Sequence, residues 1–153
     1  HPMRKCTDSL SRLTSLLWNI VHRSTLRTLD SLMPAFRRVF AEFDLTEQQW
    51  RVLRVLWESD AQPLLIIAEK TLIPSPSLVG IVDRMERDDL VKRVRTTKDR
   101  RVVQVCLTES GKALETVITP KIDALYQALQ TKMDDKEWQV LYKALDTLIT
   151  SQE

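Results

Sequence analysis

The scarcity of glycine is the feature that most limits the folds open to this chain. Only two of the 153 residues are glycines, Gly80 and Gly111. Sheet-rich proteins with many tight turns usually need more, because glycine adopts left-handed backbone conformations without steric cost. The sequence therefore predicts a mainly helical protein, and its apolar fraction of 43% is large enough to form a core.

The spacing of apolar residues predicts helices at the start of the chain. Apolar residues recur at helical intervals over 10–21 and again over 26–43. Between them lies a polar stretch, and Pro34 fits a first turn or a kink better than an undisturbed helix interior. We therefore expect a break or bend of the helix within 22–34.

Three further helices are predicted in the middle of the chain. Thr46 is a good N-cap, and Gln49 completes a capping box before a helix of about twelve residues. A short helix is expected over 64–73. Another should be capped by Ser75, with Pro76 in its first position, where the missing N–H costs nothing.

The pattern changes over 90–107, where two aliphatic runs flank a polar, basic connection. This arrangement predicts a β-hairpin. Thr108 should then cap a helix that continues past Pro120, and a last helix should start at Asp134 or Asp135.

The order of elements predicts a mainly α fold with a small β-hairpin wing, a winged helix-turn-helix with helices added at both ends. The added helices carry more apolar surface than a small winged helix needs, and such surface is usually buried in a partner subunit. We expect one intertwined domain made of N-terminal dimerisation helices (1–44), a DNA-binding region (45–107) and C-terminal dimerisation helices (108–153).

The distribution of charge favours nucleic acid as a partner. Residues 84–101 hold eight Lys or Arg against four acids, whereas residues 108–153 hold five Lys against eight acids. A short basic stripe of this kind is typical of a nucleic-acid contact.

Several functional classes are disfavoured. His22 is the only histidine besides His1, which with Pro2 looks like the remnant of an expression tag, and no Ser/Cys–His pairing, metal-ligand spacing or phosphate loop is present. We expect that the protein is not an enzyme and that it binds no metal and no cofactor. No run of about 18 apolar residues and no leader with a cleavage site occurs, so we expect a cytoplasmic protein that has no membrane span and no membrane partner. Cys6 and Cys106 are too far apart in sequence to indicate a disulfide framework.

Four stretches resemble the multiple-antibiotic-resistance regulator (MarR) family. Residues 45–53 resemble the family's "LT-x-x-Q-W-x-V-L" helix, and residues 77–86 resemble its recognition helix, which ends "V-D-R-L-E". Residues 99–101 resemble its D-x-R wing motif, and residues 107–111 resemble its "L-T-x-x-G" helix entry. The helix containing Gln49 and Trp50 is most similar to the homoprotocatechuate-catabolism repressor branch. The chain departs from the family pattern in two places. It has Gly80 where many members carry a polar or basic residue, and its segment over 6–22 is longer than in short members, which suggests an additional dimerisation arm.

The resemblance implies a repressor that binds a palindromic operator in duplex DNA as a homodimer. The first turns of the recognition helix should reach base edges in the major groove, and a wing arginine should enter the minor groove, with Asp99 bracing Arg101 by a salt bridge. The predicted DNA-binding residues are Ser75, Ser77, Val79, Gly80 and Arg84 on the helix, and Lys98, Asp99, Arg100 and Arg101 on the wing.

The resemblance also implies a small effector, an aromatic carboxylate or phenolic compound. It should bind in a crevice walled by residues 26–40 and 50–57, where a guanidinium grips the carboxylate and an indole stacks on the ring. The predicted ligand-binding residues are His22, Arg23, Arg27, Trp50, Arg51 and Arg54.

Two alternatives stay open at the level of the sequence. A regulator of the same fold could sense oxidation through Cys6, which requires a lowered thiol pKa. A helical interaction scaffold that does not bind DNA would explain the amphipathic helices, but it leaves the basic hairpin unexplained.

Overall fold

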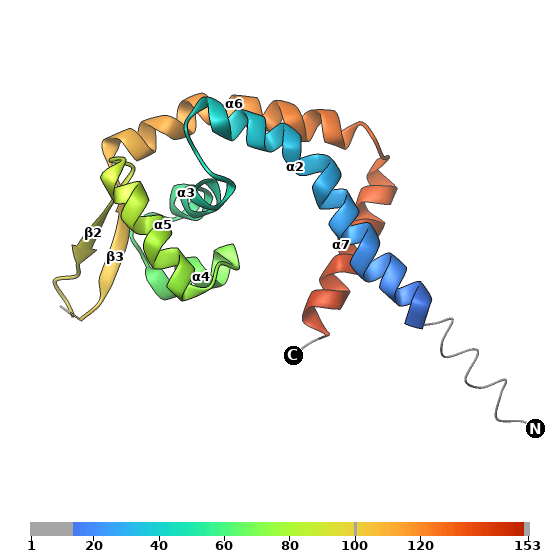
Figure 1. Ribbon diagram of the computed structural model, residues 1–153, viewed down its shortest axis with the longest axis horizontal. Helices are drawn as coiled ribbons and strands as arrows, with labels where there is room; N and C mark the ends of the chain where they lie inside the picture. Colours follow the sequence, from blue (N-terminus) through green and yellow to red (C-terminus); the bar gives the residue numbers. More distant parts are fainter. Residues whose placement is uncertain (1–13, 100, 152–153) are drawn as a thin grey trace, which may run out of the picture. The chain divides into compact units, whose positions relative to one another are not determined.

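A computed structural model describes residues 14–99 and 101–151, and Figure 1 shows the course of the chain. The fold is mainly helical with a small sheet, as predicted. It contains a π-helix, η1, six α-helices and three strands that carry labels. Their bounds are η1 (Trp18–Ser24), α2 (Thr25–Glu42), α3 (Glu47–Glu58), β1 (Gln62–Pro63), α4 (Leu64–Thr71), α5 (Ser75–Arg87), β2 (Val91–Arg95), β3 (Val103–Leu107), α6 (Glu109–Gln130) and α7 (Asp135–Thr150). The chain divides into two compact units, the first ending at Arg38 and the second beginning at Val39.

Of the break or bend expected within 22–34, the break is wrong. The chain is helical from residue 14 through η1 and into α2, and Pro34 lies inside α2 in an exposed position. The polar residues that suggested a break lie inside the helix: Ser24 Oγ donates to the Asn19 carbonyl at 2.9 Å and Thr25 Oγ1 to the Val21 carbonyl at 2.7 Å. These hydroxyls hydrogen-bond carbonyls of the preceding turn, a contact that a helix accommodates without a break and that often bends it. Residues 10–13 of the predicted apolar stripe lie outside the described residues.

Helix α3 begins as predicted. The Gln49 backbone N–H donates to Thr46 Oγ1 at 3.1 Å, and the Thr46 backbone N–H donates to Gln49 Oε1 at 3.0 Å. This capping box satisfies two N–H groups that the first turn would otherwise leave without partners. The helix buries Val52, Leu53 and Leu56 completely and so forms the centre of the second unit's core.

The predicted cap of α5 is corrected by the structure. Ser75 is already helical, and the N-cap is Pro74, whose carbonyl accepts the Leu78 N–H at 3.0 Å. Pro74 has no side-chain oxygen, so the helix begins without a side-chain cap, and Pro76 still lies in the first turn, where its missing N–H costs nothing. The buried face of α5 is formed by Leu78, Ile81, Val82 and Met85, as the apolar spacing indicates.

The predicted hairpin is confirmed, and a third strand joins it. Strands β2 and β3 pair antiparallel from Val91–Leu107 to Arg95–Val103 and project beside α5 in Figure 1. Strand β1 adds to the other side of β3, giving the order β1-β3-β2. A two-residue strand has no alternation of apolar and polar residues, which is why the sequence pattern did not reveal it.

The C-terminal helices begin where the sequence predicts. Thr108 Oγ1 accepts the Gly111 N–H at 3.0 Å at the start of α6, which continues past Pro120. A Cβ on Gly111 would lie 2.1 Å from the Leu90 carbonyl oxygen, so this close approach requires glycine. Asp134, rather than Asp135, is the N-cap of α7.

Helix α7 differs from the other helices of the second unit because none of its residues is buried. Among its exposed apolar side chains, Val140 has an accessible fraction of 68% and Ile149 one of 72%. Within residues 14–99 and 101–151, no single helix has both the length and the apolar character of a membrane span; α4 and α5 reach them only as a pair bent by 108°.

Candidate functional site

The exposed side of α5 carries the residues expected to contact DNA bases. Its buried face holds the helix against the core, and this leaves Ser75, Ser77 and Val79 exposed. At Gly80 a Cβ would meet no atom within 4 Å, so nothing in the second unit requires glycine there. Arg84 is also exposed, further along the same helix. The first turns of α5 thus present a surface of small side chains.

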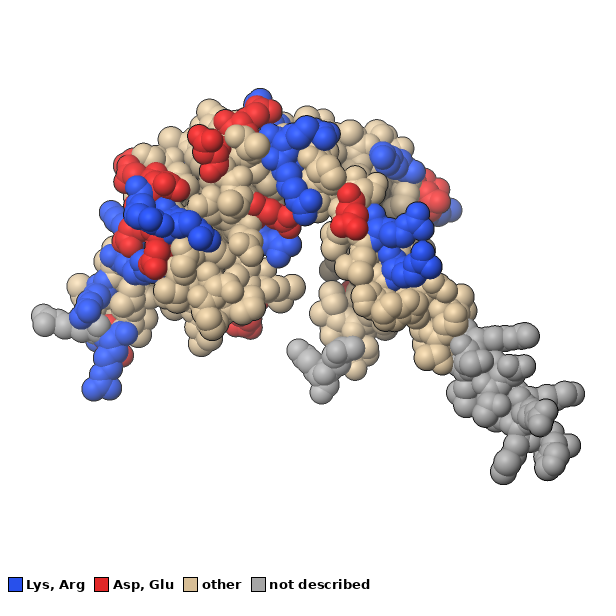
Figure 2. Space-filling model, viewed as in Figure 1, with Lys and Arg blue, Asp and Glu red and all other residues tan. Residues whose placement is uncertain are grey.

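The tip of the wing is held by its own hydrogen bonds. Thr96 Oγ1 donates to the Asp99 carbonyl at 2.6 Å and accepts the Asp99 N–H at 3.2 Å. Lys98, Asp99 and Arg101 are exposed, and Arg100 lies outside the described residues. On the face shown in Figure 2, Lys and Arg side chains gather over the hairpin.

The expected salt bridge between Asp99 and Arg101 is replaced by a backbone contact. The Arg101 backbone N–H donates to Asp99 Oδ1 at 2.9 Å. Within the described part of the chain no carboxylate forms an ion pair with the Arg101 guanidinium. Asp99 therefore shapes the turn and leaves the Arg101 side chain available to an external partner.

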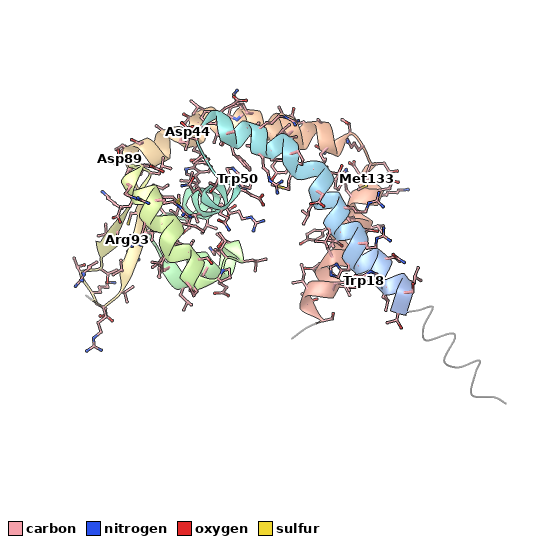
Figure 3. The ribbon with its side chains drawn as sticks, in the orientation of Figure 1. Trp18, Asp44, Trp50, Asp89, Arg93 and Met133 are labelled. Carbon is pink, nitrogen blue, oxygen red and sulfur yellow. The ribbon has the colours of Figure 1, made fainter. Side chains whose placement is uncertain are left out.

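Sequence reasoning missed the role of Arg93, which links the wing to α5 (Figure 3). Its guanidinium donates to Asp83 at 2.6 Å and to Glu86 at 2.7 Å, and its backbone N–H donates to Glu86 at 3.1 Å. Burial by itself lowers the pKa of Arg93, but the hydrogen bonds and charges of the two acids outweigh burial and raise the pKa. The signal was present in the sequence, because acids at i and i+3 lie on one helix face. These acids belong to the stretch that resembles the recognition helix.

A pocket of about 590 Å³ opens beside Trp50. Trp50 stacks on Phe40 with ring centroids 4.9 Å apart, and the Arg54 guanidinium lies 5.9 Å from the Trp50 ring. The pocket joins three helices, α3, α4 and α6. Its lining residues are Trp50, Arg51, Arg54, Val55, Glu58, Lys70, Thr71, Leu72 and Tyr126.

Three of the six predicted ligand-binding residues, Trp50, Arg51 and Arg54, come together in this pocket. The other three, His22, Arg23 and Arg27, lie on η1 and α2 in the first unit, where the rings of His22 and Trp18 are 4.1 Å apart. Sequence reasoning missed Lys70, Leu72 and Tyr126, because no periodicity relates α4 and α6 to Trp50.

The three cations that line the pocket differ in whether a carboxylate forms an ion pair with them. Arg51 pairs with Glu47 at 2.8 Å, and Arg54 pairs with Glu58 at 3.3 Å. Within residues 14–99 and 101–151, no carboxylate forms an ion pair with Lys70. The pocket therefore combines an indole ring, a phenol ring and an unmatched positive charge.

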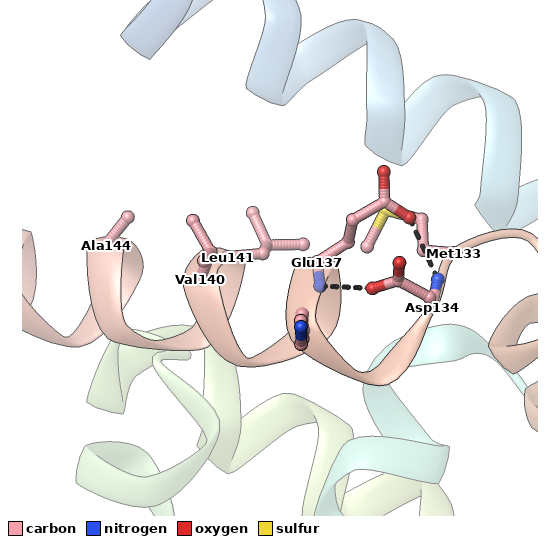
Figure 4. A pocket seen from close by; sticks show the side chains of 7 residues that line it. Met133, Asp134, Glu137, Val140, Leu141 and Ala144 are labelled. Atoms are coloured by element: carbon pink, nitrogen blue, oxygen red, sulfur yellow. Dashed lines mark hydrogen bonds between the residues drawn. The ribbon is translucent and has the colours of Figure 1, made fainter.

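A second, apolar groove of about 460 Å³ lies along the start of α7 (Figure 4). Met133, Val140, Leu141 and Ala144 provide its apolar wall. The capping box of α7 lies at one end, where Asp134 Oδ1 accepts the Glu137 N–H at 2.8 Å.

The described residues show no activated thiol and no group of three metal-ligating side chains. Burial and the nearby charge of Asp60 raise the pKa of Cys106, which keeps this thiol protonated near neutral pH. Cys6, the candidate redox sensor, lies outside the described residues.

Comparison with known proteins identifies the family. The MarR family matches over residues 45–103. The homoprotocatechuate degradative operon repressor of Escherichia coli is 35% identical over 124 residues, which cover 81% of this chain and 84% of that protein.

Two solved structures are similar over most of the chain. The transcriptional regulator PA4135 has a TM-score of 0.75 and 31% identity, covering 83% of this chain and 93% of its own. NadR in complex with 4-hydroxyphenylacetate has a TM-score of 0.74 and 29% identity, covering 86% and 96%. Together with the winged helix-turn-helix described above, these similarities show that the chain belongs to the MarR family of transcriptional regulators.

Proposed function

We propose that this protein is a homodimeric repressor that binds a palindromic operator in duplex DNA and releases it when a small aromatic carboxylate binds beside Trp50. The observation that carries the proposal is the combination of an exposed first turn of α5 with a basic wing that Arg93 ties to the same helix. Such a pair of elements suits simultaneous contact with adjacent grooves of DNA. The proposal places the protein in the cytoplasm, with its operator.

Helix α5 supplies the sequence-reading contacts of this proposal. A major groove is wide enough for one helix. The hydroxyls of Ser75 and Ser77 are short donors and acceptors for base edges, and Val79 offers apolar contact to thymine methyls. Gly80 would allow the backbone a close approach to DNA, and the space around it is open, because a Cβ there would meet no atom within 4 Å. Arg84 would contact a phosphate.

The wing supplies the second contact. The exposed side chains of Lys98 and Arg101 extend a positive charge from a hairpin tip whose turn Asp99 stabilises, and we assign Arg100, which lies outside the described residues, to the same contact. A narrow A·T-rich minor groove concentrates negative potential and attracts arginine. The alternative of a helical scaffold that does not bind DNA gives these exposed cations no role.

The pocket beside Trp50 suits an aromatic acid. Trp50 and Tyr126 offer ring faces, and Arg51, Arg54 and Lys70 exceed the single lining acid, Glu58, in charge. The similarity to NadR, solved in complex with 4-hydroxyphenylacetate, supports the same class of ligand.

Dimerisation completes the proposal. Apolar side chains that a monomer would leave in water lie on the helices near both ends of the chain, including Trp18 and Ile20 in the first unit and Leu145 and Leu148 in the second. We assign residues 1–44 and 108–153 to dimerisation and 45–107 to DNA binding. A two-fold dimer would hold its two α5 helices about 34 Å apart, one turn of DNA.

The experiment that tests this function is a titration of aromatic acids against the protein bound to its operator, following tryptophan fluorescence and DNA release together. We expect both signals to change over the same ligand concentrations, because a ligand shifts DNA affinity only if it prefers the DNA-free state. Fluorescence change without any change in DNA affinity would contradict release by the ligand. If the protein does not bind DNA even at low salt, the proposed contact of α5 and the wing with DNA is wrong.

A further inference from the structure

The distribution of charge in the Trp50 pocket singles out one residue that the family resemblance did not. A carboxylate entering the pocket meets Arg51 and Arg54, and each already has a glutamate partner one helical turn away. A carboxylate that binds either guanidinium therefore shares it with a glutamate that already matches part of its charge. Lys70, from α4, brings a charge that no carboxylate of the described residues matches.

From these observations we propose that Lys70 is the main anchor for the carboxylate of the effector. The inference rests on the proposed effector pocket and deepens it by naming the residue that binds the acid group. An ammonium donates to carboxylate oxygens from several directions, so it needs little preorganisation. Trp50 and Tyr126 would then hold the ring between them.

The position of Lys70 also relates the ligand to the DNA-reading helix. Lys70 lies in the last turn of α4, and α5 begins at Ser75. The short connection is fixed by buried side chains on α4 and in the turn: Thr71 Oγ1 donates to the Ile67 carbonyl at 2.6 Å, and Ile73 is 4% exposed. A ligand held by Lys70 therefore contacts the helix-turn-helix itself.

Two other roles would explain a lysine at this position. A cation in the last turn of a helix interacts favourably with the helix dipole, which is a structural role. The first helix of a helix-turn-helix also crosses the DNA backbone, so Lys70 could bind a phosphate instead. The three roles make different predictions for binding of a charged probe, of a neutral probe and of DNA.

The test compares Lys70→Gln with wild type in the full-length protein, using 4-hydroxyphenylacetate and its neutral analogue 4-hydroxyphenylacetamide in calorimetric titrations. Loss of a charge-assisted hydrogen bond should weaken binding of the acid at least about tenfold. Binding of the amide should change little, and DNA affinity without ligand should stay the same. Lys132→Gln, which removes a positive charge outside the pocket lining, should leave all three affinities unchanged, and Lys70→Arg should restore most of the acid binding.

Each contrary result has a separate meaning. Equal weakening for acid and amide would show a structural role, and weaker DNA binding without ligand would show a phosphate contact; either overturns the assignment of Lys70. Unchanged acid binding in Lys70→Gln overturns this inference alone. If wild type binds neither this acid nor any other aromatic acid, the effector proposal fails and the inference fails with it.

Discussion

The guanidinium of Arg93, on β2 of the wing, donates to the carboxylate of Asp83, on α5, at 2.6 Å. Glu86 binds the same side chain at 2.7 Å, so one arginine is shared by two acids of α5. Arg93 therefore holds the wing to α5, and its charge is matched by these two acids. The positive charge of Arg93, which was counted in the predicted basic stripe, pairs with acids of the same chain.

Replacing Arg93 with alanine should loosen the wing more than it destabilises the fold. The Arg93 and Asp83 side chains are 25% and 54% exposed, so the free energy of unfolding should fall by only about 1 kcal/mol. Hydrogen exchange should nevertheless speed up in β2 and β3, and operator affinity should fall because the wing is no longer fixed to α5. Lys92→Ala, a change of an exposed cation on the same strand, is the control. Identical exchange rates in wild type and Arg93→Ala would contradict the bracing role.

Replacing Arg101 with alanine should weaken operator binding by about 1–3 kcal/mol, the usual loss for a specific groove contact. The side chain is exposed and its backbone contact with Asp99 survives the substitution, so thermal stability should stay the same. Affinity is measured by fluorescence anisotropy at physiological salt, with Lys132→Ala as the matched loss of charge. An unchanged affinity would remove the wing arginine from the mechanism.

Replacing each of the two glycines with alanine should change the free energy of unfolding in opposite directions. Gly80→Ala should raise the free energy of unfolding by about 0.5–1 kcal/mol, because alanine favours the helix and its Cβ meets nothing within 4 Å. The same change should weaken operator binding if α5 approaches DNA closely there. Gly111→Ala should destabilise the fold, because its Cβ would lie 2.1 Å from the Leu90 carbonyl oxygen. Chemical denaturation of both variants measures the contrast, and tighter DNA binding by Gly80→Ala would refute the close approach.

A charge placed on α7 should disrupt the proposed dimer. Leu145 is 45% exposed in the chain by itself, and burying an arginine in its place in an apolar interface without a partner is costly. We expect Leu145→Arg to give a monomer at micromolar concentration in light scattering, while Gln139→Arg on the same helix leaves the dimer intact. Removing residues 1–22 should weaken the dimer without abolishing it. A wild-type monomer at that concentration would rule out the interface.

Cys106 should react slowly with alkylating reagents at neutral pH. Burial and the charge of Asp60 raise the pKa of its thiol, so the reactive thiolate is scarce. A raised folded-state pKa also means that this group's contribution to stability is present below the pKa of the unfolded thiol and is lost as the pH rises through the folded value. The pH dependence of alkylation, followed by mass spectrometry with a Cys106→Ser variant as the control, measures the thiolate fraction of Cys106 in the folded protein. Alkylation as fast as that of a free cysteine would contradict it.

The sequence determined the features that depend on residues close together in the chain. The Thr46–Gln49 capping box, the hairpin around a basic turn and the buried face of α5 all follow from local spacing, and the structure confirms them. The start of α5 was misplaced by one residue, because a proline cap has no side-chain signal. The continuous helix through Pro34 shows that a helix can pass through a polar stretch and a proline that composition suggests should end it.

Only the tertiary structure decided which distant side chains meet. It brought Arg93 to Asp83, placed the two residues of β1 beside β3, and gathered Lys70 and Tyr126 around Trp50. Helical and strand periods specify which face of an element is apolar, but they do not specify which elements share a pocket or an ion pair. Those pairings depend on how the buried faces pack against one another, and packing is a property of the whole core.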